Sequence, residues 1–175
     1  TAGFRRLAGL EAARASAAAH DALQQREALY LPNSEAVQVA SLGYSNALSH
    51  ILWFNTINYF GKNYRGQKNY RWLSHMCDLV IQLNPRAEHV YRFCGTMLAW
   101  EGGMPTESVR ILDRAVEHFP DSWYFYYLRG FTKVYFLADE QGGTKDIVTS
   151  ASLPNAHQVV VRLAAKKLTA QNSPE

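Results

Sequence analysis

Apolar residues recur three and four positions apart along most of the chain, and prolines separate the segments in which they do so. Pro85, Pro120 and Pro154 each follow such a segment, and the intervals between them are 35 and 34 residues. Apolar positions at this spacing form one buried face of a helix. A pattern that restarts at a nearly constant interval indicates a repeated unit. The chain is therefore predicted to be all-α and built from repeated helices.

The plan of one unit is clearest between Pro85 and Pro120. A first helix is predicted over 87–100, and Gly102-Gly103 ends it because glycine adopts a positive φ at little cost. Pro105 presets the backbone for the first turn of a second helix. That second helix has a wide apolar stripe, formed by Val109, Ile111, Leu112, Ala115, Val116 and Phe119. The unit is thus a helical hairpin.

Upstream of this hairpin the same plan is less regular. Helices are predicted over 42–60 and 70–83, and the sequence GKNYRGQKN that joins them is longer than a tight turn. Ahead of them, an alanine-rich helix is predicted over 4–29, since alanine has the highest helix propensity. Pro32 breaks that helix before the repeats begin.

Downstream, helices are predicted over 123–138 and 144–152, with DEQGG as the turn between them. A terminal helix follows over 157–168. Gly130 is expected where the first two of these helices cross. The same register puts Arg129 and Lys133 at positions where apolar packing is expected.

The segment 88–120 resembles a tetratricopeptide repeat. Gly95 holds the small position at which the two helices of that repeat cross, and Gly102-Gly103 lies at its turn. Ser108 and Ala115 hold the small positions of the second helix, and Pro120 ends the repeat. Tyr91 and Cys94 stand in place of the more usual tryptophan and leucine, and the turn has one extra residue.

The resemblance extends over 42–168 and implies a fold and a domain division. The implied fold is a right-handed solenoid of about three helical hairpins, with an alanine-rich N-terminal helix and a C-terminal capping helix. The division is an N-terminal helix or stalk over 1–31, a repeat domain over 32–168 and a flexible tail over 169–175.

Composition and charge narrow the functional classes. The 175 residues, of which 47% are apolar and 13% aromatic, suffice for one core but are few for two domains. The formal net charge is only +3 and the basic residues are scattered, so the electrostatic signature of a nucleic-acid-binding protein is missing. Apolar runs such as HILWF and VYFLA are far shorter than the roughly 20 residues that span a bilayer. We expect neither a nucleic-acid partner nor a membrane span in this sequence.

Residues that carry chemistry are sparse. Cys77 and Cys94 lie in neighbouring predicted helices without CxxC spacing, which favours two free, buried thiols over a bridge. His75 and His89 are near them in sequence, but no zinc-type spacing occurs, so neither a metal nor a cofactor is predicted. The sequence has no GxSxG elbow, phosphate-binding loop or HExxH motif. We therefore expect no enzymatic activity.

Aromatic residues are more numerous than a small stack of hairpins needs for its core. In the tetratricopeptide fold the first helix of each hairpin lines a concave groove. The groove residues that the resemblance implies are Asn55, Asn58, Tyr59, Arg92, Trp100, Tyr124, Tyr127, Phe131 and Tyr135. Tyrosine, tryptophan and arginine dominate binding hot spots, which favours docking of a peptide segment or helix of a partner protein. An aromatic stripe at helical spacing is equally typical of a core, so burial is the alternative for each ring.

The main hypothesis is a non-catalytic tetratricopeptide scaffold that mediates protein–protein interaction within a multiprotein assembly. One alternative is a structural subunit permanently buried in a large, membrane-associated complex, with no discrete groove ligand. Another is an enzyme or small-ligand binder that uses the aromatic cavity. In a variant of the main hypothesis, the helix over 4–29 folds back into the groove or extends to a neighbouring molecule.

The sequence also bears on location. LYLPNSEAV followed by SLGYSNALSHILWF resembles the entry segment of some bacterial envelope-associated tetratricopeptide proteins, in which it follows an N-terminal anchor. The chain begins at Thr1, so either an initiator was trimmed or a targeting or anchoring segment precedes it. The resemblance implies a protein of the bacterial cell envelope, anchored and facing the periplasm. The alternative is a cytoplasmic protein.

Overall fold

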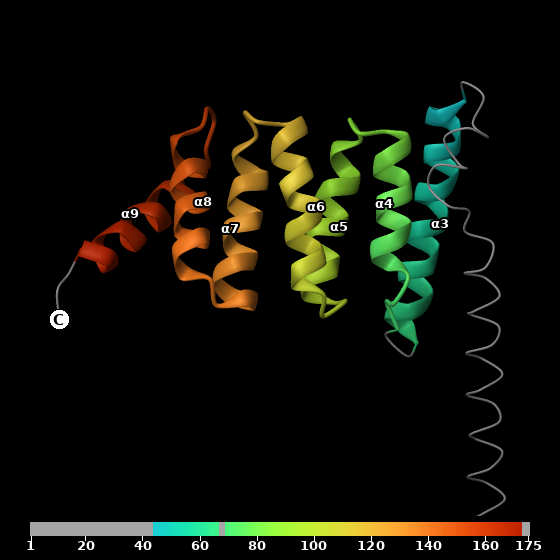
Figure 1. Ribbon diagram of the computed structural model, residues 1–175, viewed down its shortest axis with the longest axis horizontal. Helices are drawn as coiled ribbons and strands as arrows, with labels where there is room; N and C mark the ends of the chain where they lie inside the picture. The colour runs from blue at the N-terminus through green and yellow to red at the C-terminus, as the bar shows by residue number, and fades with distance from the viewer. Residues whose placement is uncertain (1–43, 67–68, 173–175) are drawn as a thin grey trace, which may run out of the picture. The chain divides into compact units, whose positions relative to one another are not determined.

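The computed structural model describes residues 44–66 and 69–172, and every regular element within these ranges is an α-helix (Figure 1). The predicted all-α class is confirmed for this part of the chain. The helices are α3 (Ser45–Arg65), α4 (Leu73–Leu83), α5 (Glu88–Trp100), α6 (Pro105–His118), α7 (Trp123–Leu137), α8 (Glu140–Ser152) and α9 (Gln158–Asn172). They belong to one compact unit, Ser41–Glu175. The helix predicted over 4–29 and its break at Pro32 lie outside the described residues.

Each helix packs against its neighbours in sequence, and α5 also packs directly against α7. Figure 1 shows the helices following one another in a row, with successive helices running in opposite directions. Consequently α3, α5 and α7 share one direction, and α4, α6 and α8 share the other. We call these the odd and the even helices.

The core lies where the odd and even helices meet. Its side chains come from α4, α5, α6 and α7 and include Leu73, Cys77, Val80, Tyr91, Cys94, Leu98, Ile111, Leu112 and Phe125, all fully buried. Burying one such leucine or phenylalanine contributes about 1.5–3 kcal/mol to folding. A second cluster of Val134, Ile147 and Ala164 joins α7, α8 and α9.

Glycines mark the closest approaches between paired helices. A Cβ added at Gly95 would lie 2.7 Å from Leu112 Cδ2, and a Cβ added at Gly130 would lie 2.7 Å from the Gly143 carbonyl oxygen. The hydroxyl of Ser108 donates to the Gly95 carbonyl at 2.5 Å. Both glycines are therefore at helix crossings, as the sequence pattern predicts.

The apolar packing expected at Arg129 and Lys133 is wrong. Arg129 donates to Asp146 through Nη2 at 2.6 Å and Nε at 2.8 Å, and Lys133 Nζ lies 2.8 Å from Asp146 Oδ2. Asp146 is on α8 with a side chain only 7% exposed. A buried carboxylate with two cationic partners replaces the apolar contact, and the register at Gly130 is kept.

Three helix boundaries differ from the prediction by four residues or more. Helix α3 continues to Arg65, so the first five residues of the expected join GKNYRGQKN are helical. Helix α8 begins at Glu140, and DEQGG is not a turn, because Asp139 Oδ1 accepts a hydrogen bond from the Gly142 N–H at 2.8 Å and caps the helix. The reversal is made by Ala138, which has a φ of 55°. Helix α9 ends at Asn172, four residues beyond the predicted end at 168.

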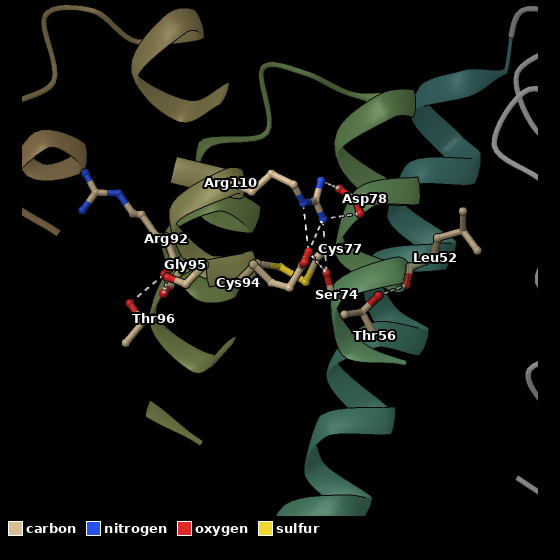
Figure 2. The surroundings of a disulfide bond; sticks show 12 residues. Leu52, Thr56, Ser74, Cys77, Asp78, Arg92, Cys94, Gly95, Thr96 and Arg110 are labelled. Atoms are coloured by element: carbon tan, nitrogen blue, oxygen red, sulfur yellow. Dashed lines mark hydrogen bonds and ion pairs between the residues drawn. A yellow bond between two sulfur atoms is a disulfide. The ribbon is translucent and has the colours of Figure 1, made fainter. Parts of the chain in front are cut away.

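Cys77 and Cys94 are not free thiols, contrary to the expectation. They form a disulfide between α4 and α5, with Cα atoms 6.2 Å apart and no exposed surface on either residue (Figure 2). The absence of CxxC spacing did not argue against a bond, because this disulfide joins two different helices. The disulfide ties the first described helix pair to the second.

Candidate partner-binding surface

Aromatic side chains connect the odd helices to one another. Between α3 and α5, the Trp53 ring lies 5.3 Å from Phe93 and 5.2 Å from His89, edge to face. Phe60 also meets Phe93, at 5.1 Å. Ring pairs of this geometry contribute about 0.5–1.5 kcal/mol beyond area burial. The contacts fix α3 beside α5.

Between α5 and α7 the rings form a stack. Trp100 and Phe131 are nearly parallel, with centroids 5.8 Å apart and an interplanar angle of 12°. Phe131 in turn lies 4.3 Å from Tyr135 and 6.0 Å from Tyr127, and Trp100 lies 5.5 Å from Phe136. Side chains held in this way lose little conformational entropy when a ligand covers them.

Arg92 extends the stack toward the N-terminal ends of α5 and α7. Its guanidinium lies 4.2 Å from the centre of the Tyr124 ring, and its Nη2 lies 2.7 Å from Glu88 Oε1. Figure 2 shows Arg92 pointing away from the disulfide, whereas Arg110 of α6 points toward Asp78 of α4. The cation thus sits over an aromatic ring on the odd helices, with nearly half of its side chain exposed.

The nine groove residues that the resemblance implies fall into two sets. Six of them are on α5 and α7: Trp100, Tyr127, Phe131 and Tyr135 form one group of contacting rings, and Arg92 with Tyr124 is joined to this group through Trp123. Trp100 is 56% exposed and Tyr135 is 59% exposed. The other three, Asn55, Asn58 and Tyr59, are on α3. None of the nine is fully buried.

On α3 the three predicted groove residues are sequence neighbours of the rings that contact α5. The Tyr59 hydroxyl donates to the Asn69 carbonyl at 2.9 Å and accepts from the Trp72 N–H at 3.3 Å, so it holds the connection to α4. Asn55 and Asn58 are exposed. Trp53 and Phe60 are the α3 rings that reach α5, and the sequence analysis treated Trp53 only as part of the apolar run HILWF. The size and aromatic character of Trp53 were the sequence features that could have identified it.

Burial raises the pKa of one tyrosine on this surface. The pKa of Tyr127 is raised by desolvation, with smaller contributions from Tyr135 and Tyr124. Its hydroxyl therefore stays protonated at neutral pH. Tyr127 therefore contributes a neutral ring to this surface.

No group of three histidine, cysteine, aspartate or glutamate side chains in the described part of the chain could hold a metal ion. An open depression on α8 and α9 is lined by Asp139, Glu140, Gln141, Gly142, Thr144, Lys145, Val148, Thr149 and Leu168. In residues 44–66 and 69–172, no helix combines the length and the apolar character needed to cross a bilayer.

Comparison with family models, curated proteins and solved structures finds no match to this chain.

Proposed function

We propose that this protein is a non-catalytic helical-repeat scaffold of the tetratricopeptide type, which docks a segment of a partner protein on the odd helices. The docking surface, here called the aromatic face, consists of Trp53, Arg92, Trp100, Tyr124, Tyr127, Phe131 and Tyr135. The observation that carries the proposal is the stacked pair Trp100 and Phe131, because Trp100 is fixed by stacking and still 56% exposed. A rigid, solvent-exposed tryptophan is the usual anchor of a binding hot spot.

The repeat architecture is supported by equivalent contacts one repeat apart. Gly95 approaches Leu112, and Gly130 approaches Ile147, so each partner is displaced by 35 residues. The direct packing of α5 on α7 is the contact that first helices of successive hairpins make in a solenoid. Trp100 and Tyr135 are likewise 35 residues apart and are both more than half exposed. The aromatic face is then the inner surface of the solenoid.

The buried disulfide supports a location outside the reducing cytosol. Disulfides form and persist in oxidising compartments such as the bacterial periplasm, and are rare in cytosolic proteins. Cys77 and Cys94 have no exposed surface, so the bond has a structural role. The proposal therefore places the scaffold on the periplasmic side of the bacterial cell envelope, held there by an anchor or by its partner.

A second candidate function is favoured by the outer surface of α3. Five large apolar residues are exposed on it or directly before it: Tyr44 at 76%, Phe54 at 67%, Ile51 at 59%, Tyr64 at 53% and Ile57 at 37%. A structural subunit that is permanently packed inside a larger complex presents such a surface. In that case α3, and not the aromatic face, carries the essential contacts.

Affinity capture from native cells with a double variant tests the proposal. Trp100→Ala/Tyr135→Ala removes both exposed rings. Tyr44→Ala/Phe54→Ala removes two rings that are more exposed, Tyr44 directly before α3 and Phe54 within it. The first variant is expected to lose the captured partner while its circular dichroism and melting temperature stay near those of the unmodified protein. Loss of the partner only with the α3 variant supports the structural-subunit alternative. If the first variant unfolds, its rings are part of the core and the proposal is wrong.

A further inference from the structure

Helix α9 has the position of the first helix of a further hairpin. Helices α5, α7 and α9 begin at Glu88, Trp123 and Gln158, so each start lies 35 residues after the one before. Helices α3, α5 and α7 each pack against the even helix that follows them in sequence. Helix α9 packs against α8, and Figure 1 shows it at the end of the row. Within residues 44–66 and 69–172, no even helix follows α9 and pairs with it.

In α5, three residues on one face make the contact with the even helix α6. Tyr91 and Leu98 have no exposed surface and belong to one core cluster with Ile111 and Leu112 of α6. Between them in sequence, Gly95 leaves room for the Leu112 side chain at the crossing. A small residue between two large ones, four positions after the first and three before the second, therefore receives an even helix.

Helix α9 has the same pattern 70 positions later, but there it is exposed. Val161, Ala165 and Leu168 hold the positions that correspond to the three contact residues of α5. Val161 is 44% exposed, Leu168 is 42% exposed, and Ala165 is exposed as well. A helix that closes a repeat array normally presents a polar outer face to solvent. The outer face of α9 is instead apolar, with a small residue where a second helix would cross it.

Helix α8 forms the other side of the same place. Thr144 and Val148 of α8 line one open depression together with Leu168 of α9. Thr144 is only 3% exposed, and its hydroxyl has no hydrogen-bond partner among the described residues. Native proteins pair nearly all buried polar groups. The Thr144 hydroxyl is therefore a donor for which a docked molecule could supply the acceptor.

The contact between α4 and α6 indicates what that acceptor is. Ser74 of α4, 70 positions before Thr144, donates its hydroxyl hydrogen to Glu107 Oε2 at 3.0 Å. Glu107 is in the first turn of α6. By the same geometry, a helix beside α8 would bring a carboxylate to Thr144. One turn further along α4, Asp78 binds two arginines of α6, whereas Val148 holds the corresponding position of α8, so the contact there is apolar.

Charge favours a different protein over a second copy of α9 as the occupant. The charged side chains of α9 and of the depression are Asp139, Glu140, Lys145, Arg162, Lys166 and Lys167. Asp139 caps α8, and Glu140 pairs with Lys167 at 2.8 Å. Lys145, Arg162 and Lys166 are exposed. Because α9 contains no acidic residue, a second α9 laid on the first would add cations and supply no carboxylate for Thr144.

We propose that the edge formed by α8 and α9 is a second docking site, which takes one amphipathic helix of a partner protein in the place of an even helix. The residues of this site, here called the helix seat, are Thr144, Val148, Val161, Ala165 and Leu168. A large apolar residue of the partner would lie over Ala165, as Leu112 lies over Gly95. A carboxylate in its first turn would accept the hydrogen bond from Thr144. An amphipathic helix laid with its apolar side in a groove is a common mode of recognition.

Selection from a display library of helix-forming peptides, randomised on one face, tests the proposal with the full chain as bait. The expected peptides have a first-turn carboxylate and a large apolar residue at the spacing of Glu107 and Leu112. Ala165→Trp fills the crossing and is expected to weaken binding of a selected peptide about tenfold. Ala170→Trp adds the same ring at another exposed alanine of α9 and is the matched control, with binding unchanged.

Thr144→Val tests the hydrogen bond separately from the apolar contact. It should not lower the melting temperature of the free chain, because the hydroxyl that it removes has no partner there. It is expected to weaken binding of a selected peptide about tenfold, and to have no effect once the first-turn carboxylate of the peptide is replaced by alanine. An equal effect on both peptides would contradict the assigned acceptor.

The other outcomes separate this proposal from the docking function of the aromatic face. Selection of no helix-forming peptide, or binding that Ala165→Trp leaves unchanged, contradicts the helix seat. Peptides released by Trp100→Ala/Tyr135→Ala and not by Ala165→Trp bind the aromatic face, so the first docking function stands and the helix seat does not. Self-association of the unmodified chain in ultracentrifugation that Ala165→Trp abolishes assigns the seat to a second copy and overturns the choice of partner. A lower melting temperature for Ala165→Trp than for Ala170→Trp would show that position 165 is already covered, and the proposal is then wrong.

Discussion

Trp100 and Phe131 lie face to face across α5 and α7, 31 residues apart in sequence and with ring centroids 5.8 Å apart. The pair packs two helices together on one side and remains open to solvent on the other. Because the proposed docking surface uses rings that also pack α5 against α7, the two roles must be separated by experiment. The predictions below begin with the packing that places the rings.

The glycines at the helix crossings should not tolerate a side chain. Gly130→Ala is expected to lower the free energy of unfolding by about 1–3 kcal/mol, because the new Cβ would meet the Gly143 backbone oxygen at 2.7 Å. Gly95→Ala should cost less, since its nearest neighbour is the movable side chain of Leu112. Chemical denaturation measures both.

Gly61 provides the matched control for the crossing glycines. It lies within α3, and a Cβ built there meets nothing within 4 Å. Gly61→Ala is therefore expected to stabilise the protein by roughly 0.5–1 kcal/mol. Equal destabilisation at Gly61 and Gly130 would show that the crossing assignment is wrong.

Removing the disulfide should destabilise the protein. Cys77→Ala/Cys94→Ala opens a loop of 17 residues, and the expected loss of unfolding free energy is about 3 kcal/mol. Thermal unfolding of the unmodified protein with and without a reductant provides an independent comparison. The protein is purified under oxidising conditions, unfolded and treated with a thiol-labelling reagent. Labelling of both cysteines would contradict the bond.

Loss of the buried Asp146 carboxylate at the α7–α8 crossing should destabilise the protein more than loss of the exposed Asp113 carboxylate. Asp146→Asn leaves Arg129 and Lys133 without their anion, and the expected loss of stability is on the order of 3 kcal/mol. Asp113→Asn is the control, because its side chain is 51% exposed and its pairing with Arg129 is worth less than about 1 kcal/mol. Similar losses for the two variants in denaturation experiments would contradict this account of the crossing.

Tyr91 should make the protein sensitive to alkaline pH. Burial raises the pKa of Tyr91 to about 12, and Arg114 offsets only part of the increase. The folded state thus holds the phenolic proton above pH 10, where the unfolded chain loses it, and stability falls as pH rises from about 10 toward 12. Tyr91→Phe should reduce this fall, and it should not destabilise the protein at neutral pH because the Tyr91 hydroxyl has no hydrogen-bond partner. The exposed Tyr135→Phe serves as the control in unfolding measurements across this pH range.

The sequence predicted the hairpin over 88–120 well because glycine and proline act locally there. Gly102-Gly103 and Pro105 mark the turn between α5 and α6, and α6 begins at Pro105. The same reasoning failed at Gly142-Gly143, where the glycines lie inside α8. Position 143 requires a small residue because α7 packs closely against it. This requirement comes from helix packing and not from the local backbone conformation.

The features that the sequence missed all depend on contacts between helices. The Cys77–Cys94 bond joins two faces that meet only after α4 and α5 pack, and the charges of Arg129 and Lys133 are acceptable only because Asp146 faces them. Trp53 was missed because Gly61 of α3 is not at a helix crossing and so does not set the register of the first repeat. On α5 and α7, Gly95 and Gly130 do set the register from which the six groove residues were predicted.

Photo-crosslinking from the position of Trp100 tests the central claim most directly. A benzoylphenylalanine placed at Trp100 is compared in native cells with the same group at Phe54, which is exposed on α3. The account predicts a covalent adduct with a discrete partner protein from position 100 and none from position 54. An adduct from position 54 alone would contradict it and would make the outer surface of α3 the functional interface.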